Sequence, residues 1–342
     1  MSCRRWRWRG GGTWLRHGGF PHTPWPPPQA RAHRRIPSRC GDRGGRILVV
    51  VSRSPVSSTH IRTFSDLAAT RGRARATAGY RRSTMGAWVP DHVADDFQAR
   101  CAALAFARPE IVVTGWTAAL FHGHHWPDAQ DVVEVATGRR RLRRPGVLAR
   151  QYEVPEAEIE EFLGPGGQPI RVASPAWTLF DLARNLDRLA AVTALDGARH
   201  FPVDVRAAVQ TLARRYPERR GRAAAERAAD EADLRSESPK ETELRLFLTD
   251  CGFDSFVPQV TVPGRRARLD LADRERKIAV EYDGRGHLEA GQHARDLERW
   301  RDLVSDGWIV LPVGNRDMRH RRATLEAQVR GALISRGWRP AD

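Results

Sequence analysis

Two short runs near the C-terminus alternate apolar and polar positions with the period of two that is typical of half-buried strands. They cover residues 268–271 and 279–284, and their apolar positions, with the residue just before the second run, are Leu269, Leu271, Ile278, Val280 and Tyr282. Polar residues 273–276 separate the two runs, as expected of a turn. The pattern therefore predicts a β-hairpin.

Upstream, the pattern alternates between helix and strand. Residues 97–107 predict an Ala-rich helix, residues 112–120 lead into another helix, and residues 132–136 predict a strand. Ser174 and Pro175 have the residue types of an N-cap and first turn, before a helix with an apolar face. That face consists of Trp177, Leu179, Phe180, Leu182 and Leu186. Residues 218–235, rich in Arg, Ala and Glu, predict a linking helix.

The polar positions of the hairpin carry its candidate chemistry. Adjacent strands lie about 4.8 Å apart, so the turn can bring Asp270 close to Glu281, and the period of two places Asp283 on the same face as Glu281. Carboxylates gathered on one face repel one another and are costly to desolvate, which favours a bound cation. An all-oxygen site of this kind suits Mg2+ or Mn2+.

With these residues in view, residues 236–335 resemble the PD-(D/E)XK nuclease superfamily, in its branch related to very-short-patch repair endonucleases. The matching positions are Ser238-Pro239-Lys240-Glu241-Thr242, Asp270, Glu281-x-Asp283-Gly284, His287, Asp296, Arg299, Leu303 and Gly307-Trp308. The resemblance implies a mixed sheet flanked by helices, and Mg2+-dependent hydrolysis of DNA phosphodiester bonds. Asp270 and Glu281 would bind the metal, with help from Glu241 or Asp283.

The chain departs from that family at one catalytic position. Asp283 stands where the superfamily has the lysine of its Glu-x-Lys pattern. The only lysines are Lys240 and Lys277, and Lys277 lies four residues before Glu281, about 13 Å along an extended strand. His287 is the better candidate base because an imidazole titrates near neutral pH. One histidine of the pair that relatives carry here is missing.

Several of these residues have a simpler explanation beside the functional one. Glu241 lies three residues after Ser238, so the two could form a capping box whether or not the glutamate also reaches a metal. Asp296 and Arg299 could pair with each other on a helix. His287 could be an ordinary loop histidine.

The upstream region resembles a second family. Residues 79–90 resemble the end of a winged-helix wing, so residues 46–90 are expected to form a degenerate winged-helix-like segment. Residues 91–217 resemble abortive-infection type IV antitoxins (AbiEi-like), which implies a mixed α/β region that could contact a protein partner. The expected order is therefore a segment at 1–45, these two regions, the helical linker at 218–235 and the nuclease-like domain at 236–335.

Charge is concentrated at the N-terminus. The chain has a formal net charge of +16, yet residues 1–84 hold 18 arginines and 2 acidic residues, which leaves 39 basic and 39 acidic residues in the remainder. Residues 1–45 are rich in Arg, Gly and Pro without periodicity, which predicts disorder. They either bind nucleic acid nonspecifically or precede the true start of translation, for which Met85 is a candidate. Beyond them, only clusters such as 139–144 and 219–222 could meet phosphates.

Other sequence features narrow the function. The four cysteines are scattered singly, which favours a reducing cytoplasm over a disulfide framework. His122, His124 and His125 lack a cysteine or carboxylate at metal-ligand spacing, so we expect no metal there. No apolar run is long enough to span a membrane. Two functions remain: an endonuclease acting on DNA in repair or defence, or a catalytically inactive DNA-binding or antitoxin-like regulator.

Overall fold

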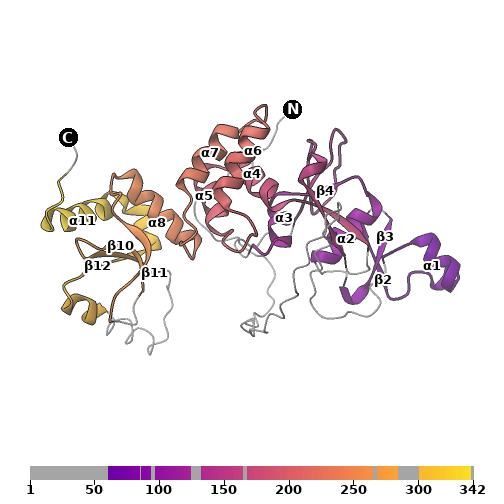
Figure 1. Ribbon diagram of the computed structural model, residues 1–342. Coiled ribbons are helices and arrows are strands. Elements are labelled where there is room, and N and C mark those ends of the chain that lie inside the picture. Colours follow the sequence, from indigo (N-terminus) through magenta and orange to yellow (C-terminus); the bar gives the residue numbers. More distant parts are fainter. Residues whose placement is uncertain are drawn as a thin grey trace, which may run out of the picture.

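The protein is a mixed α+β chain whose helices pack against three separate sheets in the part that is described. The computed structural model describes residues 61–84, 86–93, 97–124, 132–164, 168–264, 268–283 and 300–339. Figure 1 shows these elements following one another across the molecule, with α1 and α11 at opposite ends. The expected disordered segment at 1–45 and the first part of the winged-helix-like segment lie outside the described residues.

The first described elements form a small three-stranded sheet. Its order is β1-β3-β2, with β1 at Arg62–Thr63, β2 at Tyr80–Thr84 and β3 at Ala87–Pro90. Between β1 and β2 lie α1 (Phe64–Arg71) and a short 3-10 helix (Arg73–Arg75), and α1 starts in a capping box between Thr63 and Asp66. The strands β2 and β3 form an antiparallel hairpin. Ala87 and Val89 of β3 belong to the hydrophobic core of the central region, so this small sheet packs against that region.

The central region is built on a five-stranded sheet of order β6-β5-β4-β8-β7. The strands are β4 (Val112–Val113), β5 (Val133–Ala136), β6 (Val147–Arg150), β7 (Ile159–Leu163) and β8 (Pro169–Ala173). The pairs β4/β8 and β5/β6 are parallel, whereas β4/β5 and β7/β8 are antiparallel. All four residues of β5 are buried, which is typical of a strand covered on both faces.

Helices before, between and after the strands of this sheet complete the central core. They are α2 (Phe97–Ala107), α3 (Gly115–Phe121), α4 (Pro175–Asn185), α5 (Arg188–Asp196), α6 (Val205–Arg215) and α7 (Arg222–Glu231). The predicted start of α4 is confirmed, because Ser174 accepts the Trp177 N–H at 3.1 Å. The helix expected within 218–235 is α7. It buries alanines in the central core, so it belongs to that core and is not a free linker.

The C-terminal region is a four-stranded mixed sheet between helices. Its order is β12-β11-β10-β9, with β11 and β12 parallel and the other pairs antiparallel. The strands are β9 (Val257–Thr261), β10 (Arg268–Asp273), β11 (Ile278–Asp283) and β12 (Ile309–Gly314). The helices are α8 (Pro239–Asp250), α10 (Asn315–His320) and α11 (Arg322–Ser335). Two hydrophobic clusters form its core, one with α8 and α11 and one with Leu303 and Trp308.

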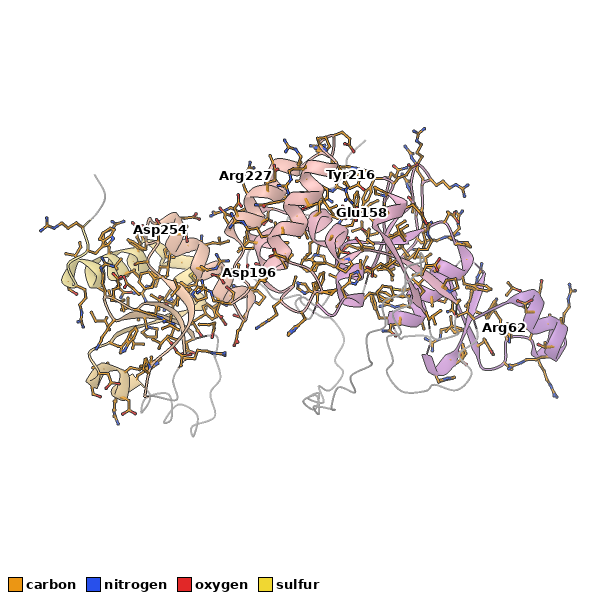
Figure 2. All side chains as sticks on the ribbon, in the orientation of Figure 1. Arg62, Glu158, Asp196, Tyr216, Arg227 and Asp254 are labelled. Carbon is orange, nitrogen blue, oxygen red and sulfur yellow. The ribbon has the colours of Figure 1, made fainter. Side chains whose placement is uncertain are left out.

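A buried polar network joins α8 to the central helices. The Asp196 carboxylate, at the end of α5, accepts from Arg245 Nη2, from Thr242 Oγ1 and from the Asp233 N–H, each at 2.7 Å. Arg245 and Thr242 lie on α8, and Figure 2 labels Asp196 at this junction. The first helix of the C-terminal region is therefore anchored to the central region by a charged group without solvent contact. No described helix is long and apolar enough to cross a membrane.

Candidate functional site

The predicted C-terminal hairpin is confirmed, and it sets Asp270 opposite Glu281. The antiparallel register pairs Asp273 with Ile278 and Leu271 with Val280, and just beyond the last of these pairs the Asp270 N–H donates to Glu281 Oε1. The structure thus brings these two predicted site residues together.

The two carboxylates accept hydrogen bonds from the backbone of the opposite strand. Glu281 Oε1 accepts the Asp270 N–H at 3.3 Å, and Asp270 Oδ2 accepts the Tyr282 N–H at 3.0 Å. Each carboxylate therefore holds the backbone of the opposite strand. Glu281 is only 6% exposed. Asp270 is half-buried. Carboxylates anchored to the backbone in this way have little freedom to move, which is the condition for a rigid ligand site.

The sheet is irregular on the other side of Asp270 as well. The pairing of β10 with β9 joins Leu269 to Val260 and Leu271 to Pro258, and it omits Asp270 and the residue opposite, Gln259. Gln259 has a φ of 56°, a left-handed conformation that costs a residue with a side chain roughly 1–2 kcal/mol. Such local strain is characteristic of functional sites, although it does not by itself identify one.

The packing of β10 changes sides at the same place. Leu269 belongs to one hydrophobic cluster, and Leu271, two residues later, belongs to the other. Strict alternation would put both leucines on the same face. The strand is therefore kinked at Asp270, opposite the left-handed Gln259.

Gln259 also connects this kink to the start of α8. Its side-chain amide donates to Glu241 Oε2 at 2.7 Å, and Glu241 further accepts from the Glu237 N–H at 2.8 Å and from Ser238 Oγ at 2.9 Å. Ser238 Oγ accepts the Glu241 N–H in return. The expected cap is present, with the glutamate reaching the residue before the N-cap. Glu241 thus has a structural role, and Gln259 lies between it and the sheet.

Gln259 is a site residue that the sequence did not reveal. Gln259 is not part of a recognisable motif, and polar residues are common in strands. Its importance depends on its left-handed backbone and on its bond to Glu241, neither of which a residue pattern encodes.

The other predicted site residues are less well defined. Asp283 is exposed at the end of β11, where it pairs in register with Gly314 of β12. His287, Asp296 and Arg299 lie outside the described residues. Within the described ranges, no three His, Cys, Asp or Glu side chains are grouped as metal ligands. The structure therefore places Asp270 with Glu281, while Glu241 does not complete a three-ligand group with them.

The oxygen donors that are present do fit a hard divalent cation. Asp270 and Glu281 supply carboxylate oxygens at one level of the hairpin, and carboxylates with water molecules are the usual ligands of Mg2+. One or two protein carboxylates are enough for such a site, because Mg2+ keeps several waters.

Two of the upstream histidines, His122 and His124, bond to backbone carbonyl oxygens. His122 Nε2 lies 2.7 Å from the Ala173 carbonyl oxygen and His124 Nε2 lies 2.9 Å from that of Ala194. Burial lowers the pKa of His122, and its bond to the carbonyl only partly opposes that effect. Both rings pack edge-on against Phe201. His125 lies outside the described residues.

Comparison with known proteins places this chain beside proteins without an assigned function. No protein-family profile matches it. Two curated relatives, the uncharacterized proteins MT2308 and Rv2248 from two strains of Mycobacterium tuberculosis, are each 29% identical over 242 residues. The match covers 68% of this chain and 86% of either relative. Neither relative has a stated activity.

Proposed function

We propose that the protein is a metal-dependent endonuclease of the PD-(D/E)XK type that hydrolyses phosphodiester bonds in DNA. The observation that supports this most directly is the cross-strand pair of Asp270 and Glu281 at a kink in a mixed sheet. A helix-flanked mixed sheet with acidic residues on adjacent strands agrees with the fold and site that the resemblance implies. The single, scattered cysteines favour the cytoplasm as its location.

In this proposal Asp270 and Glu281 hold one Mg2+ or Mn2+ ion. Such an ion lowers the pKa of a bound water and offsets charge on the scissile phosphate. Glu281 is fixed by its burial and by the Asp270 N–H, and Asp270 by the Tyr282 N–H. Gln259 and Glu241 are positioning residues that hold β9, the neighbour of the kinked β10, against α8.

Proton transfer is assigned to His287. Asp283 stands at the position of the superfamily lysine, and a carboxylate cannot supply the positive charge of an ammonium group. An imidazole can accept a proton from water near neutral pH, and general-base catalysis typically contributes on the order of a hundredfold or more. The His287→Ala variant should therefore cut DNA about a hundredfold more slowly. An unchanged rate would assign water activation to the metal alone.

The test is divalent-dependent cleavage by the full-length protein. Wild type should nick or cut DNA with Mg2+ or Mn2+ and not with EDTA, and the near-isosteric variants Asp270→Asn and Glu281→Gln should abolish cleavage. The matched control is Asp254→Asn, because Asp254 is an exposed carboxylate of the same region that is not part of the hairpin. Melting temperatures of all variants show whether lost activity reflects lost folding.

Metal binding provides an independent readout. Calorimetric titration with Mg2+ or Mn2+ should show binding to wild type and to Asp254→Asn, and weaker binding to the two hairpin variants. DNA binding should persist or tighten in those variants, since removing a carboxylate reduces repulsion of phosphates.

A noncatalytic DNA-binding or antitoxin-like regulator is the second candidate. Two observations favour it: the described residues contain no group of three metal ligands, and Asp283 replaces the lysine of the superfamily pattern. In that case, neither metal binding nor cleavage of single-stranded, double-stranded or mismatched DNA would be detected, and DNA or a protein partner would still bind.

A further inference from the structure

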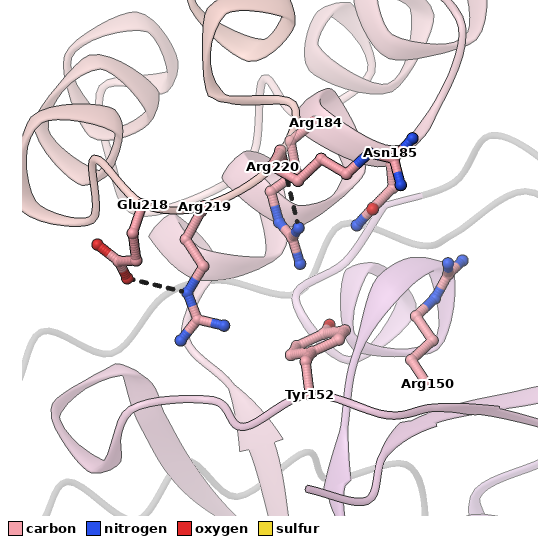
Figure 3. A pocket seen from close by; sticks show the side chains of 7 residues that line it. All are labelled: Arg150, Tyr152, Arg184, Asn185, Glu218, Arg219 and Arg220. Atoms are coloured by element: carbon pink, nitrogen blue, oxygen red, sulfur yellow. Dashed lines mark hydrogen bonds and ion pairs between the residues drawn. The ribbon is translucent and has the colours of Figure 1, made fainter. Parts of the chain in front are cut away.

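A second candidate site is an arginine-lined pocket in the central region, far along the chain from the carboxylate pair. The pocket has a volume of about 520 Å3 and lies where the end of β6, the end of α4 and the turn before α7 meet (Figure 3). Its lining residues are Arg150, Tyr152, Arg184, Asn185, Glu218, Arg219 and Arg220. Four of the seven are arginines. Arg150 pairs with Glu134, Arg184 with Asp181 and Arg219 with Glu218, so Arg220 is the lining arginine without an ion pair among the described residues.

Arg184 is built into the wall of this pocket. Its side chain is 8% exposed, its Nη2 donates to Asp181 Oδ1 at 2.6 Å, and its guanidinium carbon lies 5.0 Å from the centre of the Tyr152 ring. Its Nε–H is buried and has no acceptor among the described residues. A buried donor without a partner costs about 1–3 kcal/mol. An anion in the pocket would supply favourable interactions for such a group.

The groups around Arg184 are held by a buried carboxylate. Asp181 is 1% exposed and accepts from Tyr152 Oη at 2.6 Å and from Thr114 Oγ1 at 3.2 Å, as well as from Arg184. Burial first, and then the negative charge of Asp181, raise the pKa of Tyr152, so its hydroxyl keeps its proton. The wall is therefore preorganised without a ligand.

Two further arginines lie on the rim formed by the turn before α7. The Arg219 guanidinium stacks over the Trp177 ring at 5.2 Å and donates to the Glu153 carbonyl oxygen at 3.1 Å. Arg220 is exposed and makes no ion pair with any described residue. In Figure 3 the Arg219 and Arg184 side chains both extend from the turn and helix toward the side of the pocket where Tyr152 lies.

Positive charge continues from the pocket onto the neighbouring loop. The Gly138 N–H donates to the Tyr152 carbonyl oxygen at 3.0 Å, so the loop that follows Gly138 starts beside the pocket. Its exposed arginines are Arg139, Arg140, Arg141, Arg143 and Arg144. Of these, only Arg140 has an ion-pair partner among the described residues, namely Glu110.

We infer that this pocket binds a backbone phosphate of a nucleic-acid strand, and that neighbouring phosphates of the same strand contact the arginines of the loop 139–144. Guanidinium groups match phosphate oxygens in charge and geometry. The loop extends the positive surface beyond the volume of one small ligand, which favours a polyanion over a single phosphate. The Tyr152 ring is covered by Arg184, so the site reads the backbone and not the bases.

This inference is independent of cleavage at the C-terminal site. The central region would bind nucleic acid whether the carboxylate pair is active or not. Loss of DNA binding in pocket variants, with unchanged metal binding in the calorimetric titration, would therefore bear on the pocket alone. Loss of cleavage in Asp270→Asn, with unchanged DNA binding, would bear on the nuclease site alone.

The experiment measures DNA binding by full-length protein through fluorescence anisotropy at several salt concentrations. The test variants are Arg219→Gln/Arg220→Gln in the pocket and Arg141→Gln/Arg143→Gln in the loop. The control is Arg227→Gln, an exposed arginine on α7 that does not line the pocket (Figure 2). Arg184 is left intact because its buried pair with Asp181 supports folding.

Each double variant should weaken binding of single- and double-stranded DNA about tenfold or more, equally for different sequences, and reduce the salt slope by about one to two. The control should change affinity less than about twofold. Unchanged affinity and salt slope in both double variants would overturn the inference. It would also be overturned if inorganic phosphate or a mononucleotide bound to wild type and not to the pocket variant while DNA binding stayed the same.

Discussion

Replacing Asp196 with alanine should destabilise the protein more than any surface substitution. Three donors converge on this carboxylate, and one of them is the guanidinium of Arg245 on α8. The Arg245 side chain is 11% exposed, so the variant leaves a buried positive charge without its counter-ion. Breaking a buried pair in this way costs about 3–5 kcal/mol.

The cost should appear as a lower urea midpoint in unfolding followed by far-UV circular dichroism. The control Asp254→Asn changes an exposed carboxylate and should stay within about 0.5 kcal/mol of wild type. A loss of less than about 1 kcal/mol in Asp196→Ala would refute the reasoning, since two unsatisfied buried donors alone should cost more than that.

A double-mutant cycle with Arg245→Met tests whether the two residues act as a pair. Removing both charged groups leaves no unpaired buried charge, so the double variant should be more stable than the sum of the two single losses predicts. We expect a coupling energy in the range of about 0.5–3 kcal/mol. Additive losses would show that Asp196 and Arg245 contribute independently.

The stability that Asp196 contributes should depend on pH in the direction opposite to that of most carboxylates. Its burial raises the pKa, and the opposing effects of Arg245, Thr242 and the Asp233 N–H do not fully compensate. The folded state therefore binds a proton more readily than the unfolded state, whose pKa is about 3.9. Stability contributed by this group should fall as pH rises from about 3.9 through the raised pKa, and this trend should be absent from Asp196→Asn.

Two further substitutions test the C-terminal sheet. Burial of Asp273 opposes its ionisation, yet hydrogen bonds from the Arg276 N–H and guanidinium help to lower its pKa. The ionised Asp273 should therefore stabilise the fold above pH about 3.9, and this stabilisation should be lost as pH falls through the lowered pKa. In acid unfolding, Asp273→Asn should lack the loss of stability that wild type shows in this pH range. Gln259→Gly should be more stable than Gln259→Ala by about 1 kcal/mol. Both variants lose the hydrogen bond to Glu241, and only glycine tolerates the left-handed backbone without strain. A lower urea midpoint for Gln259→Gly than for Gln259→Ala would contradict the strain argument.

Local signals in the sequence were sufficient for several elements. The hairpin of Asp270 and Glu281 follows from alternating apolar positions on either side of a polar turn, and the start of α4 follows from Ser174 and Pro175. Such features depend on residues a few positions apart, so a periodic pattern or a cap can report them.

The packing of residues 218–235 could not be predicted from their composition. The composition of 218–235 correctly indicated a helix, yet whether that helix is free or packed depends on what covers its alanines. Ala225 and Ala229 have no solvent exposure because they pack into the central core. Small apolar residues in a polar segment give only a weak signal of burial.

By itself, the sequence determined the α+β class and the carboxylate pair on the hairpin, because alternation and turn residues constrain neighbouring strands. Only the tertiary structure decided that Gln259 is left-handed opposite Asp270, that Asp196 binds Arg245, and that arginines from three separate segments line one pocket. These contacts join residues far apart in the chain. Their energies depend on burial and on mutual orientation, which are properties of the packed molecule and not of any local pattern.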